Sequence, residues 1–368
     1  MSTMIAARLH SFDSPMILEE IPIPRPRSTE VLVKVACCGI VPNLRNVLAF
    51  FAKTLPYLPL PALPAIFGLD VAGVVAEVGD CEHNFKPGDR VYVSPGLTCG
   101  SCPACAADDS INCYNFTFRG YFGFGPDSQK LYKQYPYGGM SEYITAPQRN
   151  LIRLPDDLSF DAAARFGYLG TAYASLEKAK AGPGKTILIN GITGTLGLGA
   201  CLVALGMGVT RILGTARNQE LIHRVVDLAP GRIEVLTLGS EKIDTWARAL
   251  TGGYGVDGVV DCLGPGASGD LMVQANSALR RGGVFVNVNG VDDPVTLDVK
   301  WMQAHQIAFL GNNWFTIGQG QALAAMVQAG TLDLSVLEHR RFPLSGVNDA
   351  IDNLPARHGG FSNFVIAP

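Results

Sequence analysis

The stretch Lys185-Thr-Ile-Leu-Ile-Asn190-Gly191-Ile-Thr-Gly194-Thr-Leu-Gly197 decides the fold of this 368-residue chain. An apolar run leads into three glycines at three-residue spacing, and an apolar helical run continues through Ala200–Leu205. Strand, glycine turn and helix in this order place a diphosphate on a helix N-terminus. Here Gly191 permits the turn, Gly194 lets the backbone approach phosphate, and Gly197 lets helix and strand pack closely. We therefore expect a sheet that binds a dinucleotide.

The pattern on either side of this turn divides the chain into two parts. After residue 160, strands and helices alternate as in a parallel sheet with crossover helices. The runs are Arg211–Thr215, Gln219–Val226 (helical), Val256–Asp261 and Gly283–Val288. Before residue 150, short β-branched runs separated by turns predict a small β-barrel. These runs are Met4–Leu9, Val31–Ala36, Val71–Val78 and Arg90–Val93.

Two further stretches complete this α/β pattern. Leu55–Pro64 contains four prolines and predicts irregular structure. The C-terminal part predicts helices at Ala322–Ala329 and Val347–Leu354, followed by a strand at Asn363–Ile366.

The end of the second strand indicates which dinucleotide binds. Thr215, Arg217 and Asn218 stand there, and the segment lacks the Asp or Glu that would bond a ribose 2′-hydroxyl. A guanidinium group would instead receive a 2′-phosphate. The sequence favours NADP, although Arg217 could also be a solvated residue at a helix start.

Four cysteines, Cys99, Cys102, Cys105 and Cys113, have a spacing typical of one tetrahedral zinc site. Four thiolates leave no coordination position for a substrate, so this metal would hold a loop in shape. Unrelated cysteines are the alternative. We predict one structural zinc per chain.

Composition excludes several classes of partner. Lys plus Arg number 29 against 32 Asp plus Glu, a net charge of −3, so nothing favours nucleic acid or an anionic membrane. No apolar run reaches about 18 residues, and the first residues lack the pattern of a leader. Nine cysteines, an odd number, favour a reducing compartment, and we expect a cytoplasmic protein.

The whole chain resembles the medium-chain dehydrogenase/reductase superfamily, which includes zinc alcohol dehydrogenases and quinone oxidoreductases. The motifs that carry the resemblance are Leu32–Gly39 with Gly68–Gly73, Lys86–Val91, the cysteine lobe, Gly138–Tyr143, Gly191–Gly197, Val259–Gly264 and Leu279–Gly283. It implies a GroES-like catalytic domain (1–159, zinc lobe about 95–115), a Rossmann domain (160–310) and a return to the catalytic domain (311–368). It also implies a homodimer or homotetramer with an active site in the cleft.

The predicted coenzyme contacts combine the glycine turn with residues in the family's motifs. They are Thr171, Gly191, Thr193, Gly194, Thr195, Leu196, Gly197, Thr215, Arg217, Asn218, Cys262, Leu263 and Asn289.

Departures from the family constrain the chemistry. Val41, Leu69 and Gly167 stand where zinc alcohol dehydrogenases have a cysteine, a histidine and usually a second cysteine as ligands. Without imidazole or thiolate at these positions, a Lewis-acid zinc has no plausible set of ligands. We predict that no catalytic zinc binds.

Loss of the metal favours acceptors that are already electrophilic. The first hypothesis is an NADPH-dependent reductase of an activated C=C bond, quinone or iminium-like small apolar substrate. A zinc-independent dehydrogenase of an activated alcohol is the runner-up. A non-enzymatic NADPH-binding or sensing protein is the alternative of another class.

The candidate residues facing the nicotinamide follow from position. Asn43 could donate a hydrogen bond to a developing enolate, or be a turn residue. Tyr168 could donate a proton, or be a core aromatic. Tyr57 and Trp314, together with Val41 and Leu69, are predicted to line an apolar substrate pocket.

Overall fold

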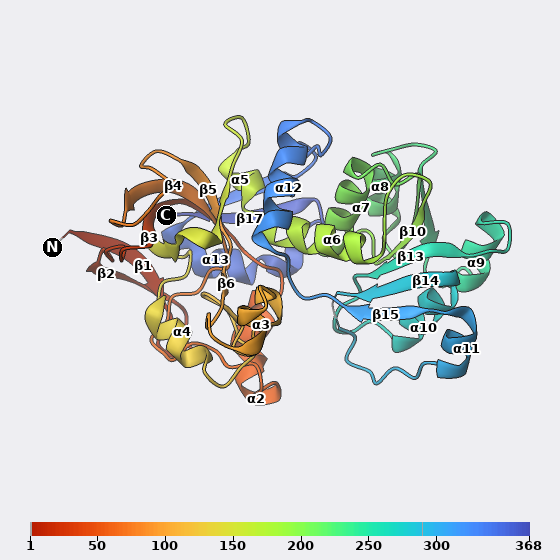
Figure 1. Ribbon diagram of the computed structural model, residues 1–368, viewed down its shortest axis with the longest axis horizontal. Helices are drawn as coiled ribbons and strands as arrows, with labels where there is room; N and C mark the ends of the chain where they lie inside the picture. Colours follow the sequence, from red (N-terminus) through yellow and green to blue (C-terminus); the bar gives the residue numbers. More distant parts are fainter. Residues whose placement is uncertain (1, 289) are drawn as a thin grey trace.

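The computed structural model describes residues 2–288 and 290–368, which form two lobes with helix α6 (Phe166–Lys178) between them (Figure 1). One lobe holds both ends of the described chain, and the other holds a six-stranded sheet with helices on both faces. None of the helices in the described residues is long and apolar enough to cross a membrane.

The first lobe is built on a seven-stranded sheet with the order β16-β17-β3-β4-β5-β9, in which β8 also pairs with β3. Its strands are β3 (Glu30–Gly39), β4 (Asp70–Val78), β5 (Arg90–Val93), β8 (Tyr143–Pro147), β9 (Leu151–Arg153), β16 (Glu338–Pro343) and β17 (Ser362–Ala367). The valines 31, 33 and 35 of β3 are all buried in its core. Two-stranded sheets pair β1 (Thr3–Arg8) with β2 (Ile17–Pro22), and β6 (Gly96–Leu97) with β7 (Thr117–Phe118).

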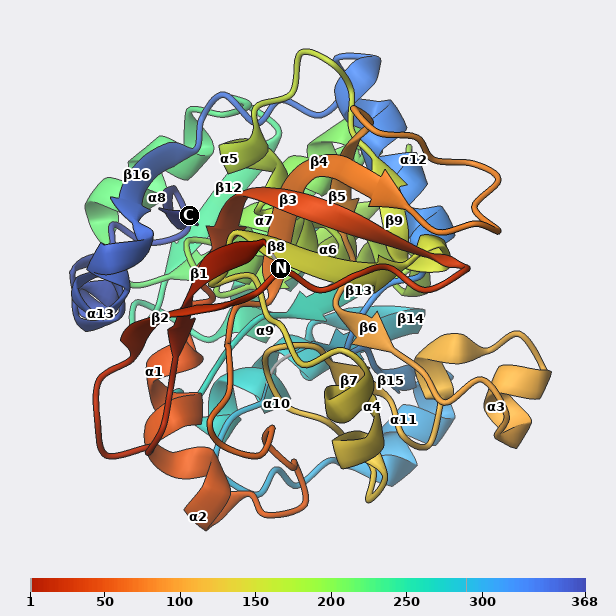
Figure 2. The ribbon, with the colours of Figure 1, turned by 90° about the vertical axis from the view of Figure 1, so that its left-hand side faces the viewer.

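Short helices connect these strands. They are α1 (Leu44–Asn46), η1 (Val47–Phe51), α2 (Ala52–Thr54), α3 (Pro103–Ala106), η2 (Ser110–Asn112), α4 (Ser128–Gln134), η3 (Gln148–Asn150), α5 (Phe160–Ala163), α12 (Ile317–Gln328), η4 (Leu344–Gly346), α13 (Val347–Asp352) and η5 (Leu354–Ala356). The proline-rich segment Leu55–Pro64 forms neither helix nor strand, as predicted. Figure 2 shows α3 projecting outward from the barrel strands.

The second lobe is a parallel sheet with the order β12-β11-β10-β13-β14-β15. Its elements are β10 (Thr186–Asn190), α7 (Thr195–Gly206), β11 (Arg211–Ala216), α8 (Gln219–Val226), β12 (Ile233–Thr237), α9 (Ile243–Leu250), β13 (Val256–Asp261), α10 (Gly269–Ser277), β14 (Leu279–Asn287), α11 (Val299–His305) and β15 (Ala308–Gly311). Because the strand order reverses between β10 and β13, a ligand crevice lies at their carboxyl ends. This confirms the predicted fold class.

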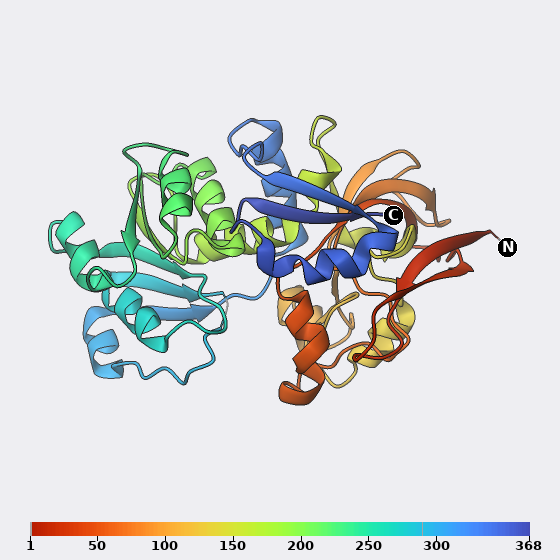
Figure 3. The ribbon, with the colours of Figure 1, turned by 180° about the vertical axis from the view of Figure 1, so that it is seen from behind.

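The chain returns to the first lobe after β15. Strand β17 pairs antiparallel with β3 at Val365 and Gly39, so the C-terminal strands extend the barrel sheet toward the second lobe (Figure 3). The strands β12, β15 and β16 are not among the predicted elements. Strand β14 begins at Leu279 instead of Gly283, because Leu279 pairs with Val256 before a register shift. The predicted domain limits at residues 159 and 310 stay a prediction.

Candidate active site and zinc lobe

The glycine turn lies at the carboxyl end of β10, where its residues take the conformations that the motif requires. Gly191 has φ of +82°, which favours glycine. A Cβ atom at Gly197 would stand 2.1 Å from the Gly191 carbonyl oxygen, so only glycine allows this packing. Gly194 precedes α7, whose first N–H groups have no partner within the helix and could donate to an anion.

The end of β11 leaves Arg217 available to a ligand. Arg217 is exposed and has no hydrogen bond or ion pair to the described residues. Asn218 begins α8, where its side-chain oxygen accepts from the Leu221 N–H at 3.0 Å. Thr215 is fully buried, and its hydroxyl donates to Asn190 at 2.5 Å and accepts from the Gly191 N–H. Thr215 therefore shapes the glycine turn, and its contact with the coenzyme stays a prediction.

The remaining predicted coenzyme residues lie on several different elements. Cys262 and Leu263 lie beside Gly191, whose built Cβ would stand 3.4 Å from Leu263 Cδ2. Thr171 is buried in α6, and its hydroxyl donates to the Gly167 carbonyl at 2.8 Å. Leu196 is in the buried first turn of α7. Asn289 lies outside the described residues.

A segment from the first lobe completes this region, and sequence reasoning missed it. Arg357 Nη1 donates to Thr195 Oγ1 at 3.0 Å, and the Gly360 N–H donates to the Thr193 carbonyl at 2.8 Å. A Cβ atom at Gly360 would stand 2.4 Å from the Gly194 carbonyl oxygen. In the sequence, only the glycine pair at 359–360 shortly after Arg357 could have pointed to this segment. A glycine pair permits close approach of two backbones, but the sequence does not show that the glycine turn is the partner.

Val41, Leu69 and Gly167 lie in one buried region. Gly39 and Asp70 are cross-strand partners, so Val41 and Leu69 flank the same end of the β3–β4 pair. Helix α6 places Gly167 against Asp70, the residue after Leu69, since a Cβ built on Gly167 would stand 2.1 Å from Asp70 Oδ1 and 2.9 Å from Trp314 Cη2. A side chain at Gly167 therefore has no room while Asp70 and Trp314 keep these positions.

Asp70 is a buried carboxyl group at the centre of this region. Tyr92 Oη donates to Asp70 Oδ1 at 2.7 Å. Burial raises the pKa of Asp70 to about 7, although the Tyr92 hydrogen bond and the Arg165 guanidinium act in the opposite direction. Arg165 itself is buried and donates to the Gly360 carbonyl at 2.6 Å.

Two phenols and one amide lie beside this carboxyl. Asn43, partly exposed, accepts from Asn46 Nδ2 at 3.0 Å. Burial raises the pKa of Tyr121 and Tyr168, while the adjacent Asn43 amide lowers that of Tyr121 and Arg165 lowers that of Tyr168. Both phenols remain protonated at neutral pH and can donate hydrogen bonds. Tyr121 was not predicted, because nothing in its aromatic-rich segment separates it from core residues.

The two predicted pocket aromatics differ in environment. Trp314 is 7 % exposed and packs edge-on against Phe118, with ring centroids 4.8 Å apart. Tyr57 is 68 % exposed on its loop, and its place in a substrate pocket stays a prediction.

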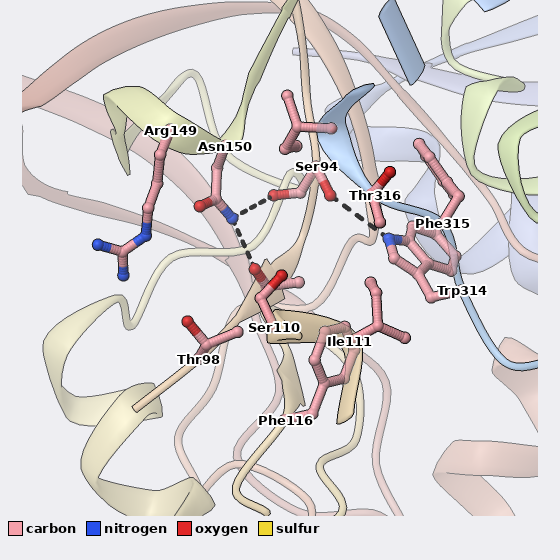
Figure 4. A pocket seen from close by; sticks show the side chains of 12 residues that line it. Ser94, Thr98, Ser110, Ile111, Phe116, Arg149, Asn150, Trp314, Phe315 and Thr316 are labelled. Atoms are coloured by element: carbon pink, nitrogen blue, oxygen red, sulfur yellow. Dashed lines mark hydrogen bonds between the residues drawn. The ribbon is translucent and has the colours of Figure 1, made fainter. Parts of the chain in front are cut away.

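Trp314 also bounds a cavity of about 70 Å³ between the cysteine lobe and α12. Figure 4 shows the indole N–H of Trp314 directed at Ser94, to whose hydroxyl it donates at 3.4 Å. On the opposite side of the cavity, the Asn150 side-chain amide donates to the carbonyls of Ser94 and Gly96. Trp314 thus separates this cavity from Gly167 and Asp70.

The four predicted metal ligands converge. The Sγ atoms of Cys99, Cys102, Cys105 and Cys113 all lie within 4.8 Å of one another. A tetrahedral zinc with Zn–S bonds of about 2.3 Å needs sulfurs about 3.8 Å apart, so the cluster fits this ion. Backbone N–H groups of Ser101 and Cys102 contribute to lowering the pKa of Cys99 to about 6, which favours the thiolate that binds metal.

Comparisons with known proteins agree with this geometry. Residues 27–156 match the alcohol dehydrogenase GroES-like domain, and residues 195–329 match the zinc-binding dehydrogenase family. The human quinone oxidoreductase is 27 % identical over 99 % of this chain and 97 % of its own length. An NAD-dependent alcohol dehydrogenase of Sulfolobus acidocaldarius is 26 % identical over 95 % of this chain and 96 % of its own length.

Solved structures show the same fold. AibC superposes with a TM-score of 0.84 at 24 % identity, covering 100 % of this chain and 96 % of that one. A Sinorhizobium meliloti protein described as a putative zinc-binding dehydrogenase, bound to NADP, has a TM-score of 0.84 at 22 % identity, with both chains fully covered.

Proposed function

Because the chain belongs to the medium-chain dehydrogenase/reductase superfamily and is an NAD(P)-dependent oxidoreductase, we propose that it is an NADPH-dependent reductase that works without a catalytic zinc. Its substrate is a small apolar molecule with an activated C=C bond, a quinone or an iminium-like carbon. The relatives named quinone oxidoreductase and alcohol dehydrogenase favour an enzyme over the non-enzymatic alternative.

One observation carries the proposal: the positions of the three family ligands hold Val41, Leu69 and Gly167 in a single buried region. Neither the aliphatic side chains nor glycine can bind a metal. The space beside Gly167 is taken by Asp70 and Trp314. Asp70 alone, already bonded to Tyr92, does not make a set of zinc ligands.

The residues present fit the coenzyme, which supplies the hydride when bound. The N–H groups at the start of α7 and the Arg357 guanidinium would hold its diphosphate. Arg217 would hold the 2′-phosphate of NADPH, since a guanidinium pairs well with phosphate oxygens. The C-terminal segment 357–360 then binds the coenzyme from the other lobe.

Side chains of this protein must donate the proton to the substrate. As hydride reaches a conjugated carbon, negative charge develops on the substrate oxygen and needs a hydrogen-bond donor. The Asn43 amide and the Tyr168 and Tyr121 phenols are neutral donors around the same region. Tyr168 is the proposed proton donor, because Arg165, 5.5 Å from its ring centroid, stabilises the phenolate that remains.

The alternative of an activated alcohol is favoured by the relatives named alcohol dehydrogenase. In that direction the alcohol proton needs a base, and Asp70, with a pKa of about 7, is a carboxyl group buried in this region. Assays in both directions distinguish the two reactions.

Two further proposals accompany this function. One structural zinc binds the four cysteines of each chain. The protein forms a homodimer or homotetramer, because β15 is an edge strand whose Leu310 is 38 % exposed, and a second copy would cover it. Light scattering coupled to size exclusion measures this state.

The deciding experiment measures NADPH oxidation with a conjugated enone, a quinone and an unactivated ketone, before and after treatment with a zinc chelator. Zinc content is measured on the same samples. We expect rapid turnover of the enone or quinone, slow turnover of the ketone, and the same rates while one zinc per chain remains. Fast ketone reduction that is abolished by the chelator, with the cysteine-bound zinc still present, contradicts the proposal.

A further inference from the structure

A second pocket lies at the end of the parallel sheet opposite to the glycine turn. The glycine turn follows the carboxyl end of β10, whereas this pocket adjoins the start of β14 at Leu279. Its volume is about 500 Å³, and its lining residues are Arg248, Gly253, Tyr254, Leu279, Arg280, Arg281 and His305. In Figure 1 the flanking helices α9 and α11 are at the far right, away from the first lobe. The pocket is therefore separate from the coenzyme crevice.

The lining of this pocket is basic, with three guanidinium groups, one imidazole and no acidic residue. Arg248 donates only to backbone carbonyls, those of Gly253, Tyr254, Ser277 and Leu279, at distances between 2.8 and 3.3 Å. Arg281 donates to the Ala304 carbonyl. Carbonyl partners fix the position of a guanidinium group without neutralising its charge.

One carboxylate compensates only part of this charge. Arg280 Nε lies 2.8 Å from Asp257 Oδ1, and the same oxygen lies 3.3 Å from Lys185 Nζ. Asp257 is thus shared between two cations. Arg248 and Arg281 keep uncompensated charges at the pocket, which attract an anion.

His305 and Tyr254 add an imidazole and an aromatic wall. His305 Nδ1 lies 2.9 Å from the Trp301 carbonyl oxygen, so this nitrogen carries a hydrogen and Nε2 is left for a ligand. Nε2 donates to an anion in the imidazolium form, in which both ring nitrogens carry hydrogen. The imidazole stacks on Trp301, with centroids 4.5 Å apart, which fixes its orientation. Tyr254, 79 % exposed, stands at the rim.

We propose that this pocket binds a small phosphate-bearing anion. Guanidinium groups match phosphate oxygens in geometry and charge. Arg280 and Arg281 keep N–H groups that bond to none of the described residues, whereas the terminal N–H groups of Arg248 are engaged with carbonyls and this residue contributes its charge. The volume exceeds what inorganic phosphate needs, so a diphosphate or a phosphate ester fits. The inference is independent of the proposed reductase function.

The test is isothermal titration of the full-length protein with inorganic pyrophosphate at low ionic strength. We expect a binding event that Arg281→Gln weakens about tenfold and His305→Gln also weakens. Lys242→Gln, an exposed cation at the other end of α9, serves as the matched control and leaves affinity unchanged. Arg217→Gln, at the coenzyme crevice, also leaves this event unchanged. Circular dichroism confirms that each variant is folded.

Three results overturn the proposal. The first is the absence of pyrophosphate binding to the wild type. The second is binding that Arg217→Gln weakens while Arg281→Gln and His305→Gln do not, which places the probe at the coenzyme crevice. The third is tighter binding of citrate, a carboxylate anion of similar charge, than of pyrophosphate. The ligand class would then be carboxylates and not phosphates.

Discussion

Arg217, an exposed side chain, is the proposed determinant of the choice between NADPH and NADH. Replacing it by Asp removes an attraction for the 2′-phosphate and adds a repulsion, while the carboxylate can bond a ribose 2′-hydroxyl. We expect Arg217→Asp to reverse the preference from NADPH to NADH. Fluorescence titration with both coenzymes at physiological salt measures the ratio. Equal affinity of the wild type for both would contradict the assignment.

Arg357 is proposed to hold the diphosphate, the part that NADPH and NADH share. Arg357→Ala removes a cation next to Thr195, so the affinities for NADPH and NADH should both fall by about tenfold with an unchanged ratio. The same titration checks this. Arg340→Ala, a cation on β16 that stacks on Phe342 and Phe364, is the control. A change in the ratio would mean that Arg357 senses the 2′-phosphate instead.

The proposed proton donor is the hydroxyl group of Tyr168. Tyr168→Phe should slow hydride transfer to an enone by roughly 10- to 1,000-fold if the phenol donates, and hardly at all if it only packs. Tyr173→Phe, on the same helix, is the matched control. Asn43→Ala and Tyr121→Phe test the other donors in single-turnover measurements. If only Tyr121→Phe slows hydride transfer, Tyr121 is the proton donor.

At the scale of elements, we expect the proposed zinc to hold the cysteine lobe more than its own packing does. Helix α3 has four residues and η2 three, which is too short to be stable alone. Cys105→Ser should lower the melting temperature by roughly 5 °C or more while altering the chemical step little. Cys81→Ser, an exposed cysteine outside the lobe, should change neither. If Cys105→Ser loses its zinc but melts at the same temperature as the wild type, the zinc has no structural role.

Elements with a strong local pattern were predictable, and those defined by distant partners were not. Helix α8 and strand β13 match their predicted limits because their apolar period and flanking residues are local. Strand β16, Glu338–Pro343, has one buried residue and takes its conformation from pairing with β17. Likewise, Arg217 could be read from the strand end, whereas Arg357 and Tyr121 become site residues only through contacts made across the fold.

At the scale of the whole molecule, buried carboxyl groups couple stability to pH. Asp70 has an ordinary pKa of 3.8, and burial raises it to about 7 in the folded protein. The folded state therefore binds this proton more tightly, so the contribution of Asp70 is fully present below its unfolded pKa and is lost as the pH rises toward about 7. Asp70→Asn should keep the Tyr92 hydrogen bond and abolish the loss of stability that Asp70 causes as the pH rises.

Urea unfolding at pH 5 and pH 8 measures the effect. Relative to the wild type, Asp70→Asn should be more stable at pH 8 than at pH 5. Asp89→Asn, whose carboxylate pairs with the half-exposed Arg153, is the control for a general change of charge. The same stability difference at both pH values would mean that Asp70 is ionised in the folded state.

The bond from Arg357 to Thr195 joins residues 162 positions apart in the chain. A ribosome that has finished the glycine turn must therefore synthesise the rest of the second lobe and the return to the first before the partner of Thr195 exists. Until then the nascent chain has the N–H groups of the proposed diphosphate site without its cation. On the proposed role of Arg357, coenzyme binding in the cell requires that both lobes have been made and joined, and we expect a chain stalled before residue 357 to bind the coenzyme weakly even with its parallel sheet fully folded.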